Sequence, residues 1–66
     1  MQISVNGESR EISDQATAAD LIRELGLEGR RVAMEINGEL QPRSGYANRR
    51  LDAGDRVEIV HAIGGG

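Results

Sequence analysis

The residues with the clearest chemical potential stand together in the sequence HAIGGG, from His61 to Gly66. The three glycines cannot build a core, and glycine loses more backbone freedom on folding than any other residue. A terminal glycine does carry an α-carboxyl group with an ordinary pKa of about 3.5, which is ionised at neutral pH. No Cβ stands beside that carboxyl carbon, so a nucleophile can approach it from both faces. Residues 64–66 are therefore either a frayed end or a reactive arm.

The side chains elsewhere do not assemble the parts of an enzyme. His61 is the only histidine, the serines have no neighbouring base, and the glycines are scattered rather than grouped into a phosphate-binding loop. Cysteine is absent, so no side chain can hold sulfur as a thioester or persulfide, and no disulfide can form. One histidine is too little for a zinc site. We expect a protein that is not itself an enzyme and that binds no metal or cofactor of its own.

Length and composition limit the partners that the chain can have. Its 66 residues suffice for one small domain, with a net charge of −3 and Tyr46 as the only aromatic residue. Nucleic-acid binding has little support, because no basic stripe with interleaved aromatics is present. There is no apolar run that could cross a membrane and no signal-peptide pattern, so we expect a cytoplasmic protein.

Residues 2–12 have the pattern of a β-hairpin. Apolar and polar residues alternate in QISV, and Asn6-Gly7 supplies the positive-φ pair that a two-residue turn requires. A strict two-residue turn would place Glu8 and Arg10 on the apolar face. A longer or bulged turn is therefore an alternative, and the register stays open.

Residues 17–25 carry the clearest helix signals in the chain. Thr17 and Asp20 have the spacing of a capping box, and apolar residues follow at helical intervals on one face. Gly26 stands where a left-handed residue ends a helix. The sequence predicts a short amphipathic helix here.

The second half of the chain alternates between strands and turns. Residues 32–36 predict a strand, residues 40–50 an irregular crossing with a short strand at its end, and residues 52–55 a tight turn. A last strand follows from residue 56 to about residue 62. The order of elements predicts an α+β fold, with a mixed sheet of four to five strands and one helix packed across it. The first and last strands can pair in parallel at its centre.

This order, with LDAGDRVEIV before terminal glycines, resembles that of the β-grasp, ubiquitin-like sulfur carriers, and most closely the ThiS family of thiamine biosynthesis. The resemblance covers the whole chain through MQISVNGE, ATAADLIRELGL, VAMEINGELQPRS and VEIVHAIGGG. The small subunits of molybdopterin synthase also end in Gly-Gly, but they are usually longer and carry Phe and Pro before the tail. This chain has no Phe, and its only proline is Pro42.

The resemblance implies a β-grasp domain over residues 1–62 and a flexible glycine tail over residues 63–66. It implies that a ThiF-type adenylyltransferase uses ATP to adenylate the carboxylate of Gly66. A sulfur donor system, such as a cysteine desulfurase, then supplies the sulfur of a thiocarboxylate, and a ThiG-type thiazole synthase takes that sulfur up. Gly64 and Gly65 would enter the partners' active sites. The alternative is a MoaD-like carrier for molybdopterin synthesis or a ubiquitin-like protein modifier.

Three residues before the glycines are candidate partner contacts, each with a structural alternative. Val60 is out of phase with Val57 and Ile59, which predicts either an exposed docking patch or burial under the irregular crossing. His61 is a strand-end histidine or a recognition residue. Ile63 is a plug at the end of the sheet or an apolar contact.

Overall fold

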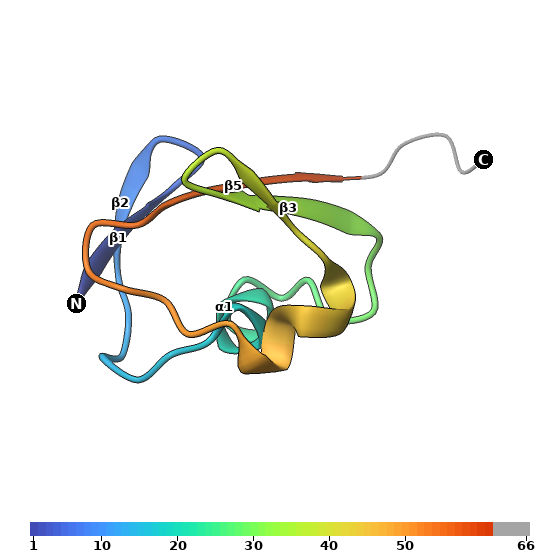
Figure 1. Ribbon diagram of the computed structural model, residues 1–66, viewed down its shortest axis with the longest axis horizontal. Helices are drawn as coiled ribbons and strands as arrows, with labels where there is room; N and C mark the ends of the chain where they lie inside the picture. Colours follow the sequence, from blue (N-terminus) through green and yellow to red (C-terminus); the bar gives the residue numbers. More distant parts are fainter. Residues whose placement is uncertain (62–66) are drawn as a thin grey trace.

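The computed structural model describes residues 1–61, which form one mixed sheet with helices on one face (Figure 1). The elements in chain order are β1 (Gln2–Val5), β2 (Glu8–Glu11), α1 (Ala18–Glu24), β3 (Val32–Ile36), β4 (Glu39–Gln41), the 3-10 helix η1 (Arg43–Asn48) and β5 (Arg56–His61). The strand order is β2-β1-β5-β3-β4. β1 and β5 are parallel, and the other neighbours are antiparallel. The expected α+β fold with a central parallel pair is confirmed, with five strands.

The core lies between the sheet and the layer that α1 and η1 form beneath it in Figure 1. Inward-facing strand residues pack there against the apolar stripe of α1, as the alternation of each strand predicts. Tyr46 of η1 closes one side, and burial raises the pKa of its hydroxyl group. The buried core comprises Ile3, Ile12, Ala16, Ala18, Leu21, Ile22, Met34, Ile36, Tyr46, Leu51, Val57 and Ile59.

The predicted capping box begins α1. The hydroxyl of Thr17 accepts the backbone N–H of Asp20 at 3.2 Å, and the Asp20 carboxylate accepts the backbone N–H of Thr17 at 3.0 Å. The backbone hydrogen bond from Thr17, together with the guanidinium of Arg23, holds the pKa of Asp20 below its ordinary value. The ionised carboxylate therefore stabilises the start of the helix.

The end of α1 is also as the sequence predicts. Gly26 has φ of 72°, and its N–H donates to the carbonyl of Arg23 at 3.1 Å. The N–H of Leu27 donates to the carbonyl of Ile22 at 3.0 Å. These two bonds make a Schellman motif, which stops the helix and turns the chain toward β3.

The first hairpin has the strict two-residue turn, so the longer or bulged turn was wrong. Asn6-Gly7 forms the turn with φ of 51° and 84°, Glu8 pairs with Val5, and Arg10 pairs with Ile3. The charged residues are tolerated because β2 is an edge strand. Glu8 is exposed, and Arg10 is only half-buried.

Residues 40–50 are more regular than the sequence predicts. β4 pairs with β3 after a second Asn-Gly turn, and η1 follows with the N–H of Gly45 bonded to the carbonyl of Pro42 at 3.0 Å. The expected short strand at residues 49–51 is a single antiparallel bridge between Arg50 and Thr17. This bridge ties the start of α1 to the segment that leads into β5.

Candidate functional site

The residues of chemical interest follow β5, the central strand of the sheet. β3 pairs with the last five residues of β5, from Val57 to His61. β1 pairs with β5 only at Arg56 and Val57, so the end of β5 has one strand neighbour. His61 is the last residue that the structure describes, and the predicted site residues Ile63, Gly64, Gly65 and Gly66 lie outside the described residues. What the structure defines is the strand that leads to them.

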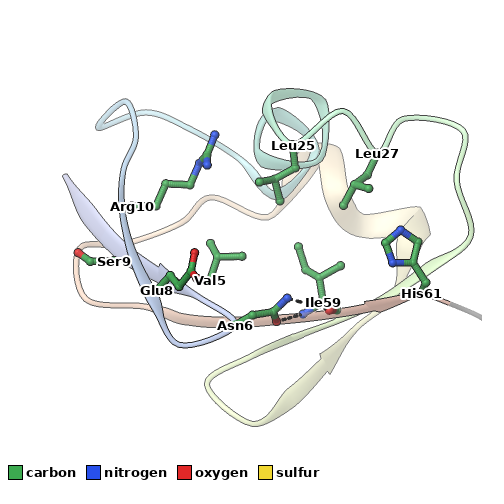
Figure 2. Close-up of a pocket in the computed structure, with 9 residues that line it drawn as sticks. All are labelled: Val5, Asn6, Glu8, Ser9, Arg10, Leu25, Leu27, Ile59 and His61. Atoms are coloured by element: carbon green, nitrogen blue, oxygen red, sulfur yellow. Dashed lines mark hydrogen bonds between the residues drawn. The ribbon is translucent and has the colours of Figure 1, made fainter.

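Beyond the residues of β5 that pair with β1, the side-chain amide of Asn6 forms hydrogen bonds with the backbone of β5. The carboxamide of Asn6 accepts the N–H of Ile59 at 2.8 Å and donates to the carbonyl of Ile59 at 3.1 Å (Figure 2). Asn6 is the first turn residue after β1 and has a left-handed backbone, and its side chain reaches β5 (Figure 2). The amide therefore fixes β5 at Ile59, beyond the residues that pair with β1.

The other Asn-Gly turn binds the beginning of the same strand. The N–H of Asn37 donates to the carbonyl of Arg56 at 2.8 Å, and the side-chain oxygen of Asn37 accepts the N–H of Arg56 at 2.9 Å. The amide nitrogen of Asn37 donates to the carboxylate of Asp55 at 3.0 Å. Asp55 is 7% exposed and also accepts the N–H of Asp52 at 2.8 Å. The 52–55 turn predicted from sequence is confirmed, and its carboxylate holds the turn.

The face of the sheet away from α1 carries the two large apolar residues that are exposed among residues 1–61. Val60 is 62% exposed and Leu40 is 68% exposed. Glu35 lies opposite both Leu40 and Glu58, and Ala33 lies opposite Val60, so these side chains share the outer face. Of the two alternatives for Val60, exposure is confirmed and burial was wrong. We call Ala33, Leu40 and Val60 the outer patch; its centre carries the carboxylates of Glu35 and Glu58.

His61 is exposed and has the same parity as Ile59, so its side chain lies on the helix side of the sheet. It stands at one end of a cleft of about 400 Å³ between the first hairpin and the end of α1 (Figure 2). We call this cleft the hairpin groove; it is lined chiefly by Val5, Arg10, Leu25, Leu27, Ile59 and His61. The structure thus separates His61 from Val60, which points to the opposite face.

The described residues do not bring together a cluster suited to metal binding. Within residues 1–61, no three His, Asp or Glu side chains converge as metal ligands. In the same range, no helix has the length and apolar character needed to cross a membrane.

Sequence reasoning missed the two asparagine side chains that fix β5. Both were recognised as turn residues, since Asn-Gly is the strongest short-range hairpin signal. Their bonds to β5 could not be predicted, because Asn6 and Ile59 are 53 positions apart and no local pattern links them. The exposure of Leu40 was also missed, because the sequence predicts an irregular crossing where β4 forms.

The sheet order, the parallel pair at its centre and the helix across one face define a β-grasp domain. The ThiS family model matches residues 3–66. The crystal structure of the thiamine biosynthesis protein ThiS from Geobacter metallireducens is 28% identical, covers all of both chains and superposes with a TM-score of 0.86. The chain belongs to the ThiS family, the sulfur carriers of thiamine biosynthesis.

The curated relatives that are similar to this chain differ in length. The chain is 46% identical over 66 residues to a thiazole synthase of Paramagnetospirillum magneticum, of which it spans only 20% of the length. A thiazole synthase of Magnetococcus marinus is 36% identical, with the same share covered. The uncharacterized protein ycf40 of Porphyra purpurea is 32% identical and is covered over 93% of its length.

Proposed function

We propose that the protein carries sulfur as a thiocarboxylate on Gly66 and donates it for thiazole formation. The observation that carries this proposal is the position of β5. It is the central strand, fixed by β3 and by two asparagine amides, and residues 62–66 follow it directly. In this proposal residues 1–62 are the scaffold, and residues 63–66 are the arm that partner enzymes charge and discharge.

The first step activates the terminal carboxyl group. A free Gly66 carboxylate is the nucleophile, because an α-carboxyl group with an ordinary pKa of about 3.5 is ionised at neutral pH. One carboxylate oxygen forms a bond to the α-phosphorus of ATP, and the bond from that phosphorus to the bridging oxygen of pyrophosphate breaks. Pyrophosphate leaves, and the product is an acyl-adenylate. A ThiF-type adenylyltransferase binds the ATP and supplies the catalytic groups.

The second step exchanges AMP for sulfur. The terminal sulfur of a persulfide, formed by a donor system such as a cysteine desulfurase, attacks the acyl carbon, and AMP leaves with the bonding electrons. A second thiol of the donor system then attacks the donor sulfur of the resulting acyl disulfide, so the S–S bond breaks, the thiocarboxylate leaves, and a disulfide forms on the donor. The terminal glycine suits this step, since no Cβ blocks either face of the carbonyl. The chain has no cysteine, so the terminal acyl group is its one place for carried sulfur.

Docking must compensate for ordering the arm, which costs roughly 1–2 kcal/mol per residue in backbone entropy. The outer patch offers apolar area for this, because Val60 is one residue from the end of the described strand and Leu40 lies on the same face. We assign Val60 to contact with the adenylyltransferase and the thiazole synthase. His61 and Ile63 are further proposed contacts, on either side of the strand end.

The relatives support a ThiG-type thiazole synthase as the acceptor. Two proteins named thiazole synthase contain a homologue of the whole chain within a longer protein. A carrier and its acceptor in one polypeptide meet at high effective concentration. We propose that the separate chain meets the same enzyme by docking.

Intact mass spectrometry tests the proposal. The 66-residue chain is incubated with ATP, a ThiF-type adenylyltransferase and a sulfide source. We expect a gain of about 16 Da at Gly66, because one oxygen is exchanged for sulfur in the acyl group. Omission of ATP must abolish the gain. Absence of both the acyl-adenylate and the thiocarboxylate with an adenylyltransferase active on another ThiS protein contradicts the proposal.

A substitution in the arm distinguishes entry of the arm into a partner's active site from an effect on the stability of the domain. Gly65→Val should block activation, because a branched side chain does not fit a channel shaped for glycine, and should change the free energy of unfolding by less than about 0.5 kcal/mol. Ser44→Val, at an exposed position of η1, is the matched control and should be activated normally. Normal activation of the Gly65 variant would show that the arm does not enter a narrow channel.

A further inference from the structure

The hairpin groove lies on the side of the sheet opposite the outer patch. Its floor is aliphatic, made by the half-buried Val5, Leu25 and Leu27 together with Ile59 (Figure 2). Its volume of about 400 Å³ is within the range of sites that bind a ligand or an inserted side chain. The sulfur chemistry proposed for Gly66 makes no use of this floor.

The wall of the groove on one side is a free strand edge. Met1 and Ile12 exchange both backbone hydrogen bonds, at 2.7 and 2.9 Å, so they form a hydrogen-bonded pair. Such pairs alternate with non-bonded pairs along an antiparallel ladder, which makes Ser4–Ser9 non-bonded. The N–H and C=O of Ser9 therefore point away from β1, at the outer edge of the sheet. Ser9 lines the groove, so these backbone groups are within reach of a chain bound there.

Arg10 supplies a positive charge at one end of the groove, and its side chain is 38% exposed. Its Nε is buried and has no hydrogen-bond partner among residues 1–61. Its nearest carboxylate is that of Glu24, 3.8 Å from a terminal guanidinium nitrogen and therefore beyond hydrogen-bonding distance. The exposed part of this side chain can meet a carboxylate of a bound segment, and a carboxylate at hydrogen-bonding distance would form a stronger pair than the present contact with Glu24.

The length of the groove favours an extended chain over a compact ligand. Arg10 lies opposite Ile3, Val5 lies opposite Val57, and His61 is four residues further along β5. The two ends are therefore separated by six strand positions, or about 20 Å at 3.3 Å per residue. A compact ligand would leave one end empty, whereas an extended segment of about six residues spans the distance.

We propose that the hairpin groove binds an extended segment of a partner protein that pairs with the free edge of β2 at Ser9. One aliphatic side chain of the segment lies on the floor beside Leu25, and one acidic side chain pairs with Arg10. In strand addition of this kind, main-chain hydrogen bonds supply affinity and side-chain pockets supply specificity. The partner is recognised as an acidic, aliphatic peptide.

A display library of random twelve-residue peptides tests this proposal. The peptides are selected on the full 66-residue chain, and an enriched peptide is synthesised and titrated by NMR. We expect the enriched sequences to combine aliphatic and acidic residues, and the amide shifts to map to Ser9, Arg10, Leu25 and Leu27. Failure to enrich any such peptide, or shifts confined to the outer patch, overturns the proposal.

Two substitutions test the two proposed contacts of the groove, the backbone edge at Ser9 and the charge of Arg10. Ser9→Pro removes the outward N–H, and proline is tolerated on an edge strand where that donor faces solvent. Arg10→Gln removes the charge while keeping a polar side chain. Each should weaken peptide binding at least tenfold with the remaining amide spectrum unchanged, and Val60→Ser should leave binding unchanged. Equal affinity of all three variants contradicts the proposal.

Other occupants give different results in the same assay. A second copy pairing through β2 would appear as a dimer in light scattering that Ser9→Pro dissolves. The chain's own residues 62–66 would appear as tighter peptide binding after their deletion. Either result overturns the proposal of a partner segment.

The proposal of peptide binding in the groove and the proposal of sulfur carriage on Gly66 can be rejected separately. Ser9→Pro and Arg10→Gln should form the thiocarboxylate at the normal rate, since neither residue lies on the outer patch or in the arm. Peptide binding without thiocarboxylate formation would retain the groove and reject the proposed function. Thiocarboxylate formation without peptide binding would retain the proposed function and reject the groove as a binding site.

Discussion

The two Asn-Gly turns have nearly the same backbone but hold different ends of the same strand. Asn6 and Asn37 have φ of 51° and 54°, and each closes a two-residue hairpin. Asn37 binds Arg56 at the start of β5 and is backed by the buried carboxylate of Asp55. Asn6 binds Ile59 near the end of β5 and has no such carboxylate behind it among residues 1–61.

One local motif therefore serves two purposes, depending on the residues that surround it. Where Asn37 binds the buried carboxylate of Asp55, its amide stabilises the domain as a whole. Where Asn6 replaces a missing strand neighbour, its amide chiefly determines how firmly the last residues of β5 are held. The stability of the domain and the hold on the last residues of β5 can therefore be varied separately.

The largest effect is expected at the start of β5. Asp55→Ala leaves the amide of Asn37 and the N–H of Asp52 without their acceptor in a partly buried site, which should lower the free energy of unfolding by about 2–3 kcal/mol. Urea unfolding measures this. Asp52→Ala is the control and should cost less than about 0.5 kcal/mol, because its exposed side chain can be lost without disturbing the network. Equal losses in the two variants would contradict the assigned role of Asp55.

A smaller and more local effect is expected at the end of β5. Asn6→Gly keeps the left-handed turn and removes only the amide, which should cost about 1 kcal/mol in unfolding free energy. Amide exchange should accelerate most at Ile59, where the side-chain acceptor is lost. Asn37→Gly is the matched control and should accelerate exchange at Arg56 instead. Uniform acceleration along β5 in both variants would show that the two turns are equivalent.

The smallest effect on the free energy of unfolding is expected from the charges at the open end of the first hairpin. The Met1 ammonium donates to Asp14 at 2.8 Å and lies 3.1 Å from Glu11; these contacts raise the pKa of the ammonium and lower that of Asp14. The ammonium's contribution to stability is full below about pH 8 and is lost as pH rises through its raised pKa. The contribution of Asp14 is present above about pH 4 and is lost as pH falls through its lowered pKa.

A series of urea midpoints against pH checks this prediction. Asp14→Asn should flatten the fall of the urea midpoint at acid pH and weaken its fall at alkaline pH. The reason is that the substitution removes the main partner of the Met1 ammonium. Glu8→Gln, at an exposed position near the other end of β2, is the control and should leave both declines in place. An unchanged profile in the Asp14 variant would contradict the ion pair's contribution.

Much of the fold could be predicted because its signals are local. The capping box of Thr17 and Asp20, the left-handed Gly26 and the 52–55 turn each lie within a few residues of the groups they bind. The register of the first hairpin stayed open because the cost of placing Arg10 on the inner face depends on β2 being an edge, which is a property of the assembled sheet.

The chemistry proposed for Gly66 stays a prediction, because residues 62–66 lie outside the described residues. It rests on the glycines and the absence of cysteine, which can be read directly from the sequence. The exposure of Val60 depends on which face α1 covers, and the bonds of Asn6 depend on β1 and β5 being neighbours. Such tertiary relations join residues far apart in the sequence, so short patterns do not encode them.

The central claim is that a firmly held strand presents a terminal acyl group on which other enzymes act. Growth without thiamine, in a bacterium lacking its own ThiS carrier but retaining the partner enzymes, tests it most directly. The intact chain should restore growth, and a chain without Gly65 and Gly66 should fail although it folds equally well. Equal growth with the shortened chain would contradict the account.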